Sequence, residues 1–223
     1  MSDPPVSATR LAAELGERLP AADGVPVEAF ALVERVRELV EAVVMTDVSP
    51  AVRAAAAGRV AAVTDALRAE RRDVPLMLVR HADGRVESLL QAGSGRLNPQ
   101  SPPLEWVHRP TEPPLGSEPR SVEVTARCTF SAAHAGSPGR VHGSVLAGVL
   151  DEVTGIAIRA AGAGGMTVAL NVSLKGGVPI GAVAQIAARY TAGEGRKSFA
   201  TGEVTVDGVV VAEASVVYVA ERA

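Results

Sequence analysis

The stretch that decides the fold is residues 139–171, GRVHGSVLAGVLDEVTGIAIRAAGAGGMTVALN. It predicts His142 and Gly143 at the start of an apolar helix, Asp151 inside that helix and Thr167 on the following strand. Unpaired backbone N–H groups at a helix start polarise a carbonyl group. A carboxylate among apolar neighbours is unfavourable unless it is paired or takes part in chemistry. Together these residues indicate hydrolysis of an activated acyl group.

The spacing within this helix also predicts how the protein assembles. Gly143 and Asp151 are eight residues apart, which places them roughly 12 Å apart along one helix at ~1.5 Å per residue. One reacting carbonyl cannot contact both. Two antiparallel copies of the helix, packed across a two-fold axis, would bring Gly143 of one chain to Asp151 of the other. We therefore expect a homodimer, or a tetramer, with shared active sites.

Strand patterns surround this helix from residue 121 onward. Apolar and polar residues alternate over 122–130, the helix covers about 144–161, and further strands are predicted over 168–174, 182–191, 197–206 and 209–219. Tight turns such as Gly193-Glu194-Gly195 and Asp207-Gly208 join the later strands. Because short connections imply antiparallel pairing, the pattern predicts an α+β fold in which a curved antiparallel sheet wraps the helix.

The first half of the chain has a different organisation. Residues 26–45 have the spacing of an amphipathic helix, and Ser49-Pro50 is a start signal for a second, Ala-rich helix. A short hairpin is predicted around Asp83-Gly84. Residues 93–119 contain seven prolines. We therefore divide the chain into an N-terminal helical extension (1–92), a proline-rich connection (93–120) that either covers a site or is a plain linker, and the α+β domain (121–223).

Composition excludes several classes of function. The net charge is −3 and the 22 Lys and Arg residues are scattered, so we expect no nucleic-acid partner. No apolar run approaches the ~18 residues of a membrane span, and the first ten residues lack the pattern of a signal peptide. A cytoplasmic protein that binds no membrane is the expectation.

Neither cysteine nor histidine indicates a metal or redox centre. Cys128 is the only cysteine, so an intramolecular disulfide is impossible, and its place in an apolar pattern predicts a buried, unreactive thiol. His81, His108 and His134 lack metal-ligand spacing. We expect neither a metal ion nor a cofactor.

The segment GSPGRVHGSVLAGVLDEVTG (136–155) resembles the helix motif of the acyl-CoA thioesterases related to the phenylacetic-acid pathway enzyme. In that family His-Gly-Gly opens the helix, an Asp follows nine residues after the His, and in some members a Thr sixteen residues further assists it. His142, Asp151 and Thr167 have this spacing. The segments at 95–104, 166–181 and 195–219 also resemble the family, so the likeness covers about residues 93–220.

The resemblance implies a hotdog fold and hydrolysis of an acyl-CoA, or of a carrier-protein thioester, without a metal or redox cofactor. Ser144 stands where the family has its second glycine. A serine can cap a helix and still donate its backbone N–H. Its side chain narrows the space for a thioester, so Ser144 is a candidate substrate-binding residue that affects rate and substrate range.

The candidate residues each have a role and a simpler alternative. Asp151 is read as a general base or a direct nucleophile, or else as a buried, hydrogen-bonded interface residue. Gly143 polarises the carbonyl through its N–H or only permits a tight turn. His142 positions the thioester or holds the turn, and Thr167 orients water or is an ordinary strand residue. Glu152 points about 100° away from Asp151 along the helix and is read as a surface or interface charge.

Arg196 and Lys197, after a turn, are candidates for contacting the phosphates of coenzyme A or are solvated hairpin charges. Two other functions stay open. A hotdog hydratase or dehydratase would rely on a catalytic His that the sequence does not supply. If the protein is instead a non-catalytic acyl-binding dimer, Ser144 indicates that catalytic activity has been lost.

Overall fold

The structure is a computed structural model that describes residues 15, 18–113 and 117–220. The first ten residues, from which we expected no signal peptide, lie outside the described residues. The helices are η2 (Ala22–Gly24), α2 (Val27–Met45), α3 (Pro50–Arg68), η3 (Ala132–His134) and α4 (Gly143–Ala160). The strands are β1 (Leu78–Arg80), β2 (Val86–Ser88), β3 (Glu105–His108), β4 (Glu123–Thr129), β5 (Met166–Leu174), β6 (Val183–Glu194), β7 (Lys197–Val206) and β8 (Val209–Val219).

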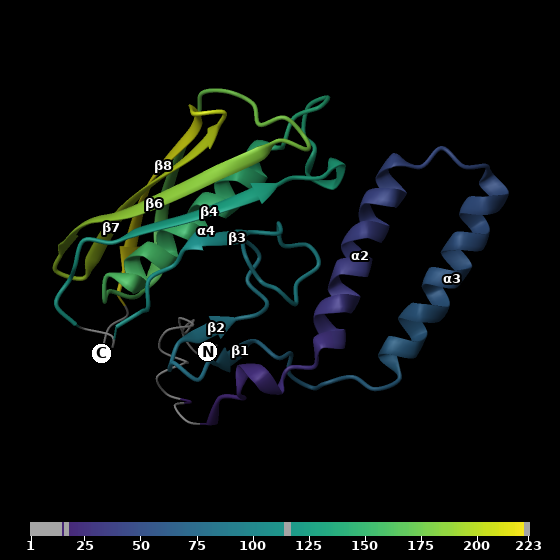
Figure 1. Cartoon of the computed structure of the whole chain (residues 1–223), viewed down its shortest axis with the longest axis horizontal. Helices are drawn as coiled ribbons and strands as arrows, with labels where there is room; N and C mark the ends of the chain where they lie inside the picture. Colours follow the sequence, from purple (N-terminus) through teal and green to yellow (C-terminus); the bar gives the residue numbers. More distant parts are fainter. Residues whose placement is uncertain (1–14, 16–17, 114–116, 221–223) are drawn as a thin grey trace, which may run out of the picture.

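A six-stranded antiparallel sheet wraps one face of α4 (Figure 1), as the sequence predicted. Its strand order is β3-β4-β6-β7-β8-β5. Inward-facing residues alternate with exposed ones along β4, β7 and β8, while α4 buries ten of its residues. The core therefore lies between α4 and the sheet, and its largest fully buried side chains are Phe130, Leu146, Leu150, Ile156, Ile158 and Ile186.

One strand of the sheet comes from the segment predicted as a connection. β3 pairs with β4, with Glu105 opposite Arg127 and Trp106 opposite Ala126. The prolines on both sides hide this four-residue strand in the sequence, but Trp106 packs against the core and β3 covers what would otherwise be an open sheet edge. The sheet thus begins before residue 121, and the three-part division of the chain stays a prediction.

The N-terminal helices form where the sequence places them. Ser49 caps α3 by accepting a hydrogen bond from the backbone N–H of Val52, and Pro50 occupies its first turn. The two helices project away from the sheet as a hairpin (Figure 1). Only Val33 of α2 is buried, and no residue of α3 is buried. Among the described residues, α2 is held to the body by few contacts, such as Arg37 donating to the Asn98 carbonyl, and α3 has no buried residue.

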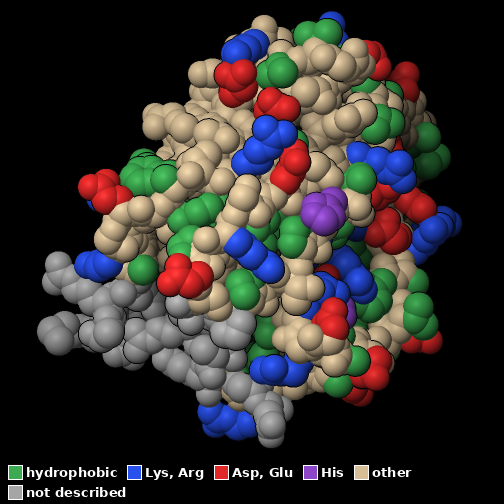
Figure 2. All heavy atoms as spheres, turned by 60° about the vertical axis from the view of Figure 1, so that its left-hand side comes forward, with side chains coloured by type: hydrophobic (Ala, Val, Ile, Leu, Met, Phe, Trp, Pro, Cys, Tyr) green, Lys and Arg blue, Asp and Glu red, His purple; other side chains and the backbone are tan. Residues whose placement is uncertain are grey.

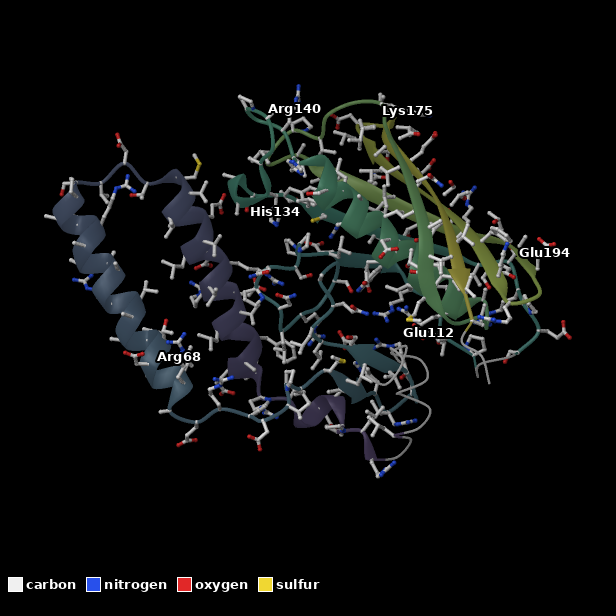
Figure 3. The ribbon with its side chains drawn as sticks, turned by 180° about the vertical axis from the view of Figure 1, so that it is seen from behind. Arg68, Glu112, His134, Arg140, Lys175 and Glu194 are labelled. Atoms are coloured by element: carbon white, nitrogen blue, oxygen red, sulfur yellow. The ribbon has the colours of Figure 1, made fainter. Side chains whose placement is uncertain are left out.

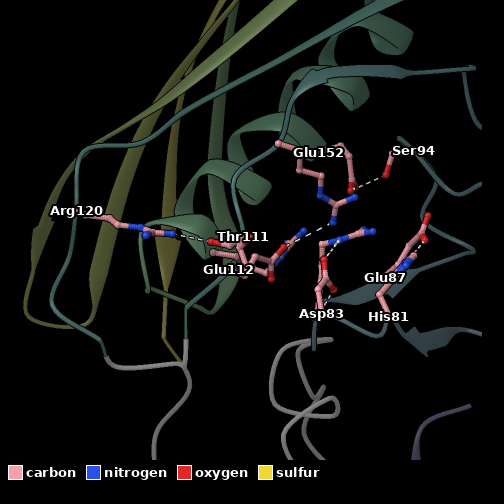
Figure 4. A network of polar contacts seen from close by, with 11 residues as sticks. His81, Asp83, Glu87, Ser94, Thr111, Glu112, Arg120 and Glu152 are labelled. Carbon is pink, nitrogen blue, oxygen red and sulfur yellow. Dashed lines mark hydrogen bonds and ion pairs between the residues drawn. The ribbon is translucent and has the colours of Figure 1, made fainter. Parts of the chain in front are cut away.

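A polar network fastens the proline-rich connection to α4 (Figure 4). The Glu112 carboxylate pairs with Arg159 of α4 at 3.4 Å and with Arg109 at 3.6 Å. Arg120 donates to the backbone carbonyl of Ala160. Burial lowers the pKa of Arg109, whereas for Arg159 the negative charges of Glu112 and Glu152 outweigh burial and raise the pKa. The connection is therefore a packed part of the domain.

The surface carries charges of both signs (Figure 2), and the cysteine lies in the core. On the face in Figure 2, acidic and basic side chains are interspersed. No helix among the described residues is both long and apolar enough to cross a bilayer. Burial raises the pKa of the Cys128 thiol to about 12, which confirms a buried cysteine that stays protonated at neutral pH.

Candidate active site

His142 caps the N-terminus of α4 with its own ring. Its Nδ1 accepts a hydrogen bond from the Ser144 backbone N–H at 3.1 Å and lies 2.7 Å from the Ser144 hydroxyl. Because a backbone N–H can only donate, Nδ1 is unprotonated, and the proton of the neutral ring is on Nε2. The His142 ring is exposed. It therefore presents an N–H donor at the start of the helix.

The backbone N–H of Gly143 has no hydrogen-bond partner among the residues that the structure describes. It lies in the first turn of α4, where the helix dipole favours negative charge. A Cβ at this position would come within 2.6 Å of the Leu174 side chain at the end of β5. Glycine thus lets β5 approach the helix start while leaving the N–H available to an incoming carbonyl oxygen.

Asp151 and Thr167 meet halfway along α4. The Thr167 hydroxyl donates to Oδ1 of Asp151 at 2.8 Å. Thr167 lies at the start of β5, where the pairing with β8 shifts in register between Thr167 and Ala169. The Asp151 carboxylate is half-buried, and its second oxygen has no hydrogen-bond partner within the described chain. One carboxylate oxygen is therefore fixed by a neighbour while the other is free to accept a proton.

Tyr218 is a site residue that our sequence analysis missed. Its hydroxyl donates to the backbone carbonyl of Asp151 at 3.3 Å, and Tyr218 pairs directly with Thr167 across β8 and β5. A Cβ on Gly155 would lie 2.4 Å from that hydroxyl, so only glycine lets Tyr218 reach the helix. Burial, with a smaller contribution from the Asp151 charge, raises the pKa of Tyr218 to about 12. The hydroxyl thus remains a donor.

The structure does not bring all the predicted site residues together. Arg196 and Lys197 lie at the turn between β6 and β7, next to Glu194 at the end of β6. Figure 3 shows Glu194 at the opposite end of the sheet from Arg140, which precedes the start of α4. Arg196 donates to the backbone carbonyl of Ala220. Lys197 pairs with Val219, and Val219 with Met166, next to Thr167. These two cations therefore share an end of the sheet with Thr167 rather than with His142.

Glu152 has a more specific place than a surface charge. Its carboxylate accepts a hydrogen bond from the hydroxyl of Ser94 in the proline-rich connection at 2.8 Å. The connection thus contacts α4 at Glu152, and its role as a cover for the site stays a prediction. In the part of the chain that the structure describes, no group of three or more His, Cys, Asp and Glu side chains is arranged to hold a metal ion.

Among solved structures, the chain is similar to a protein described as a thioesterase superfamily protein, with a TM-score of 0.72 and 23% identity over 90% of this chain and 97% of the other. The chain has the hotdog fold. This confirms the architecture that the resemblance implied. No protein-family model and no curated protein matches the sequence.

Two further solved structures match over about half of the chain. One is a putative thioesterase from Ralstonia eutropha, described as phenylacetic acid degradation-related, with a TM-score of 0.41 and 26% identity over 44% of this chain and 75% of the other. The other is a hypothetical thioesterase from Streptococcus pneumoniae with coenzyme A, with a TM-score of 0.45 and 15% identity over 54% of this chain and 91% of the other.

Proposed function

We propose that this protein is an acyl-CoA thioesterase, which converts an acyl-CoA and water into a free acid and coenzyme A. The observation that carries the proposal is the Asp151 carboxylate, held by Thr167 through one oxygen and open at the other. The unpaired N–H of Gly143 supplies the second requirement, a donor for the thioester oxygen. The hotdog fold, which matches that of a thioesterase superfamily protein, agrees with this chemistry.

In the proposed reaction Asp151 acts as the general base. Its free oxygen takes a proton from water as the water oxygen attacks the thioester carbonyl. The carbonyl oxygen gains negative charge next to the N–H of Gly143, where it is stabilised. The carbon–sulfur bond then breaks, and the coenzyme A thiolate takes up the proton that Asp151 received, which regenerates the carboxylate. Direct attack by Asp151, which would form an anhydride for water to open, remains the alternative.

The other site residues orient these groups. The Thr167 hydroxyl donates a hydrogen bond to Asp151, and we propose that this bond fixes the carboxylate. Tyr218 is proposed to hold the backbone of Asp151. His142 presents its Nε2–H beside the helix start as a donor that positions the thioester. Arg196 and Lys197 are proposed to meet coenzyme A phosphates at the end of the sheet that holds Thr167.

The proposed active site needs two chains. Gly143 and Asp151 lie on one helix, eight residues and roughly 12 Å apart, so one carbonyl cannot reach both within a chain. The outer edge of β5 is unpaired among the described residues, and Val168 and Leu174 on it are 60% and 55% exposed. An open apolar edge of this kind favours pairing with a second chain.

A cytoplasmic location stays a prediction.

A panel of thioesters tests the proposal. Acetyl-, octanoyl-, phenylacetyl- and benzoyl-CoA are incubated with the protein, and free thiol release is measured. We expect turnover of at least one acyl-CoA, and matching carrier-protein thioesters show which carrier is preferred. The non-catalytic alternative gains some support from Ser144, whose hydroxyl contacts the capping His142. Saturable acyl-CoA binding with no thiol release would establish that alternative and contradict the proposal.

Replacing Ser144 by glycine is expected to keep or raise turnover and to broaden the range of acyl groups accepted. The variant retains the backbone N–H that donates a hydrogen bond to Nδ1 of His142. It loses the side chain that we expect to narrow the space for the thioester. The measurement is kcat/KM across the same panel. If a folded Ser144→Gly protein hydrolyses no thioester, the Ser144 hydroxyl takes part in the reaction and our assignment of its role is wrong.

A further inference from the structure

The exposed side of α2 carries an apolar seam, defined by Leu32, Val36, Leu39 and Val43. These residues follow each other at intervals of four, three and four, which is the heptad spacing of helices that pack side by side. Leu32, Leu39 and Val43 are 40%, 43% and 61% exposed. Val33, which points elsewhere, is the residue of α2 that is buried against the rest of the chain. Val36 is half-buried and lines a pocket with Pro99 and His134, so one side of the seam adjoins the contact that anchors α2, while Leu32, Leu39 and Val43 stay exposed.

The second helix of the hairpin carries a matching seam. Ala56, Val60, Val63 and Leu67 of α3 repeat the intervals of four, three and four. The last three are 40%, 55% and 53% exposed, and none of the 19 residues of α3 is buried. An isolated helix of this length is only marginally stable in water, because helices in proteins gain most of their stability from packing. A partner for α3 is thus missing within the described chain.

The exposed apolar surface of the hairpin is large. Twelve large apolar side chains on α2, α3 and their connecting turn are at least 40% exposed. At roughly 80 Å² each they present on the order of 1,000 Å², compared with ~800 Å² that each partner buries in a stable interface. A typical monomer leaves a largest apolar patch of ~300–600 Å². The hairpin as a whole thus exposes more apolar surface than a typical monomer, and six of these twelve side chains lie in the two seams.

We propose that this hairpin docks against the same hairpin of a second copy of the chain, forming a four-helix bundle. The seams match because both have the same repeat. The charges match as well: α2 carries four Glu and two Arg, a net charge of −2, while α3 carries three Arg and one Asp, a net charge of +2. Pairing α2 of one copy with α3 of its partner is therefore favourable, and a two-fold axis forms both pairs at once.

A lipid surface is a poorer match for these helices. Helices that lie on membranes carry Lys and Arg on the polar face, whereas α2 is acidic and the hairpin as a whole, with Asp47 in its turn, has a net charge of −1. The bundle is also separate from the proposed active-site dimer, since α2 and α3 project away from α4 and β5 (Figure 1). If both interfaces form, the protein is a tetramer, and the bundle does not depend on the proposed activity.

The test compares molar masses by size exclusion with light scattering. The seam variant, Leu39→Glu with Val60→Glu, places charge in both seams. The matched control, Ala31→Glu with Ala57→Glu, adds the same charge at exposed positions of α2 and α3 outside the seams. We expect the seam variant to have half the mass of the parent and the control to keep the parent's mass.

Cross-linking tests the same contact without charge in the seam. A Leu39→Cys protein is mixed with a Val60→Cys protein and treated with a short bis-maleimide, with buried Cys128 as an unreactive background. We expect a covalent dimer containing one chain of each kind. Three results of these two experiments would each overturn the proposal: equal masses for parent and seam variant, mass loss in the control, or no mixed cross-link. The proposal would also fail if the parent were a monomer that cosediments with phosphatidylcholine–phosphatidylserine vesicles.

Discussion

Replacing Asp151 by asparagine is expected to lower thioester turnover by at least ~10²-fold, the scale expected when a general base is removed. Asparagine has nearly the same shape as aspartate, and its amide oxygen can still accept the hydrogen bond from Thr167 that Oδ1 accepts now. The fold should therefore persist while the proton acceptor is lost. The measurement is kcat for the best acyl-CoA in the panel, with circular dichroism to establish folding.

Two neighbouring substitutions control for effects on packing. Glu152→Gln removes the adjacent carboxylate, which contacts Ser94 rather than the proposed substrate, and we expect it to retain most of the turnover. Thr167→Val removes only the group that orients Asp151, and we expect a smaller loss than in Asp151→Asn. A folded Asp151→Asn protein that hydrolyses thioesters like the parent would show that Asp151 is not the base.

Replacing Glu112 by glutamine is expected to destabilise the fold by about 1–3 kcal/mol, the scale for leaving a buried partner unsatisfied. Glu112 is the shared partner of Arg109 and Arg159, whose side chains are only 13% and 23% exposed. Without the carboxylate, two partly buried positive charges lose the partner that they share, and only the weaker influence of Glu152 on Arg159 and of Glu87 on Arg109 remains. The expected readout is a lower urea midpoint, together with loosening of the proline-rich connection over α4.

The matched control for this prediction is Glu118→Gln, which neutralises an exposed carboxylate in the same connection. We expect its urea midpoint to stay close to that of the parent, because exposed charges contribute little to stability. Equal midpoints for Glu112→Gln and the parent would mean that the network in Figure 4 does not hold the connection in place.

The regular elements were predictable from sequence because each has a strong local signal. Ser49-Pro50 marks the start of α3, and alternation of polar and apolar residues marks β4 to β8. β3 was missed because four residues between prolines carry no periodicity of their own, and its place depends on the free edge of β4. Such long-range pairing is invisible to local patterns.

The site was predictable to the extent that it follows from spacing along the chain. Asp151 and Thr167 are sixteen residues apart, across the end of α4 and the turn into β5, and the two side chains do meet. Tyr218 was missed because its contact with Asp151 depends on the register between β8 and β5 and on the space at Gly155. The hydrogen bond between Glu152 and Ser94 depends in the same way on a distant segment.

The claim at the centre of this account is that Gly143 of one chain and Asp151 of another act on the same thioester. Its most direct test is to mix two inactive proteins, Asp151→Asn and Gly143→Pro, and to measure turnover after subunit exchange. Proline removes the N–H of Gly143 and is tolerated in the first turn of a helix. Its Cβ requires the end of the Leu174 side chain, which would lie 2.6 Å away, to shift. The extended backbone of His142, with φ −67° and ψ 138°, suits a residue before proline.

Each mixed dimer would contain one site with both Asp151 and Gly143 intact and one site with neither. We therefore predict that activity appears on mixing and rises with the fraction of mixed dimers, up to about half of the parent's turnover per dimer, provided that both variants fold and exchange is shown independently. If mixed dimers form and no activity returns, or if the parent is fully active as a dilute monomer, the shared-site account is contradicted.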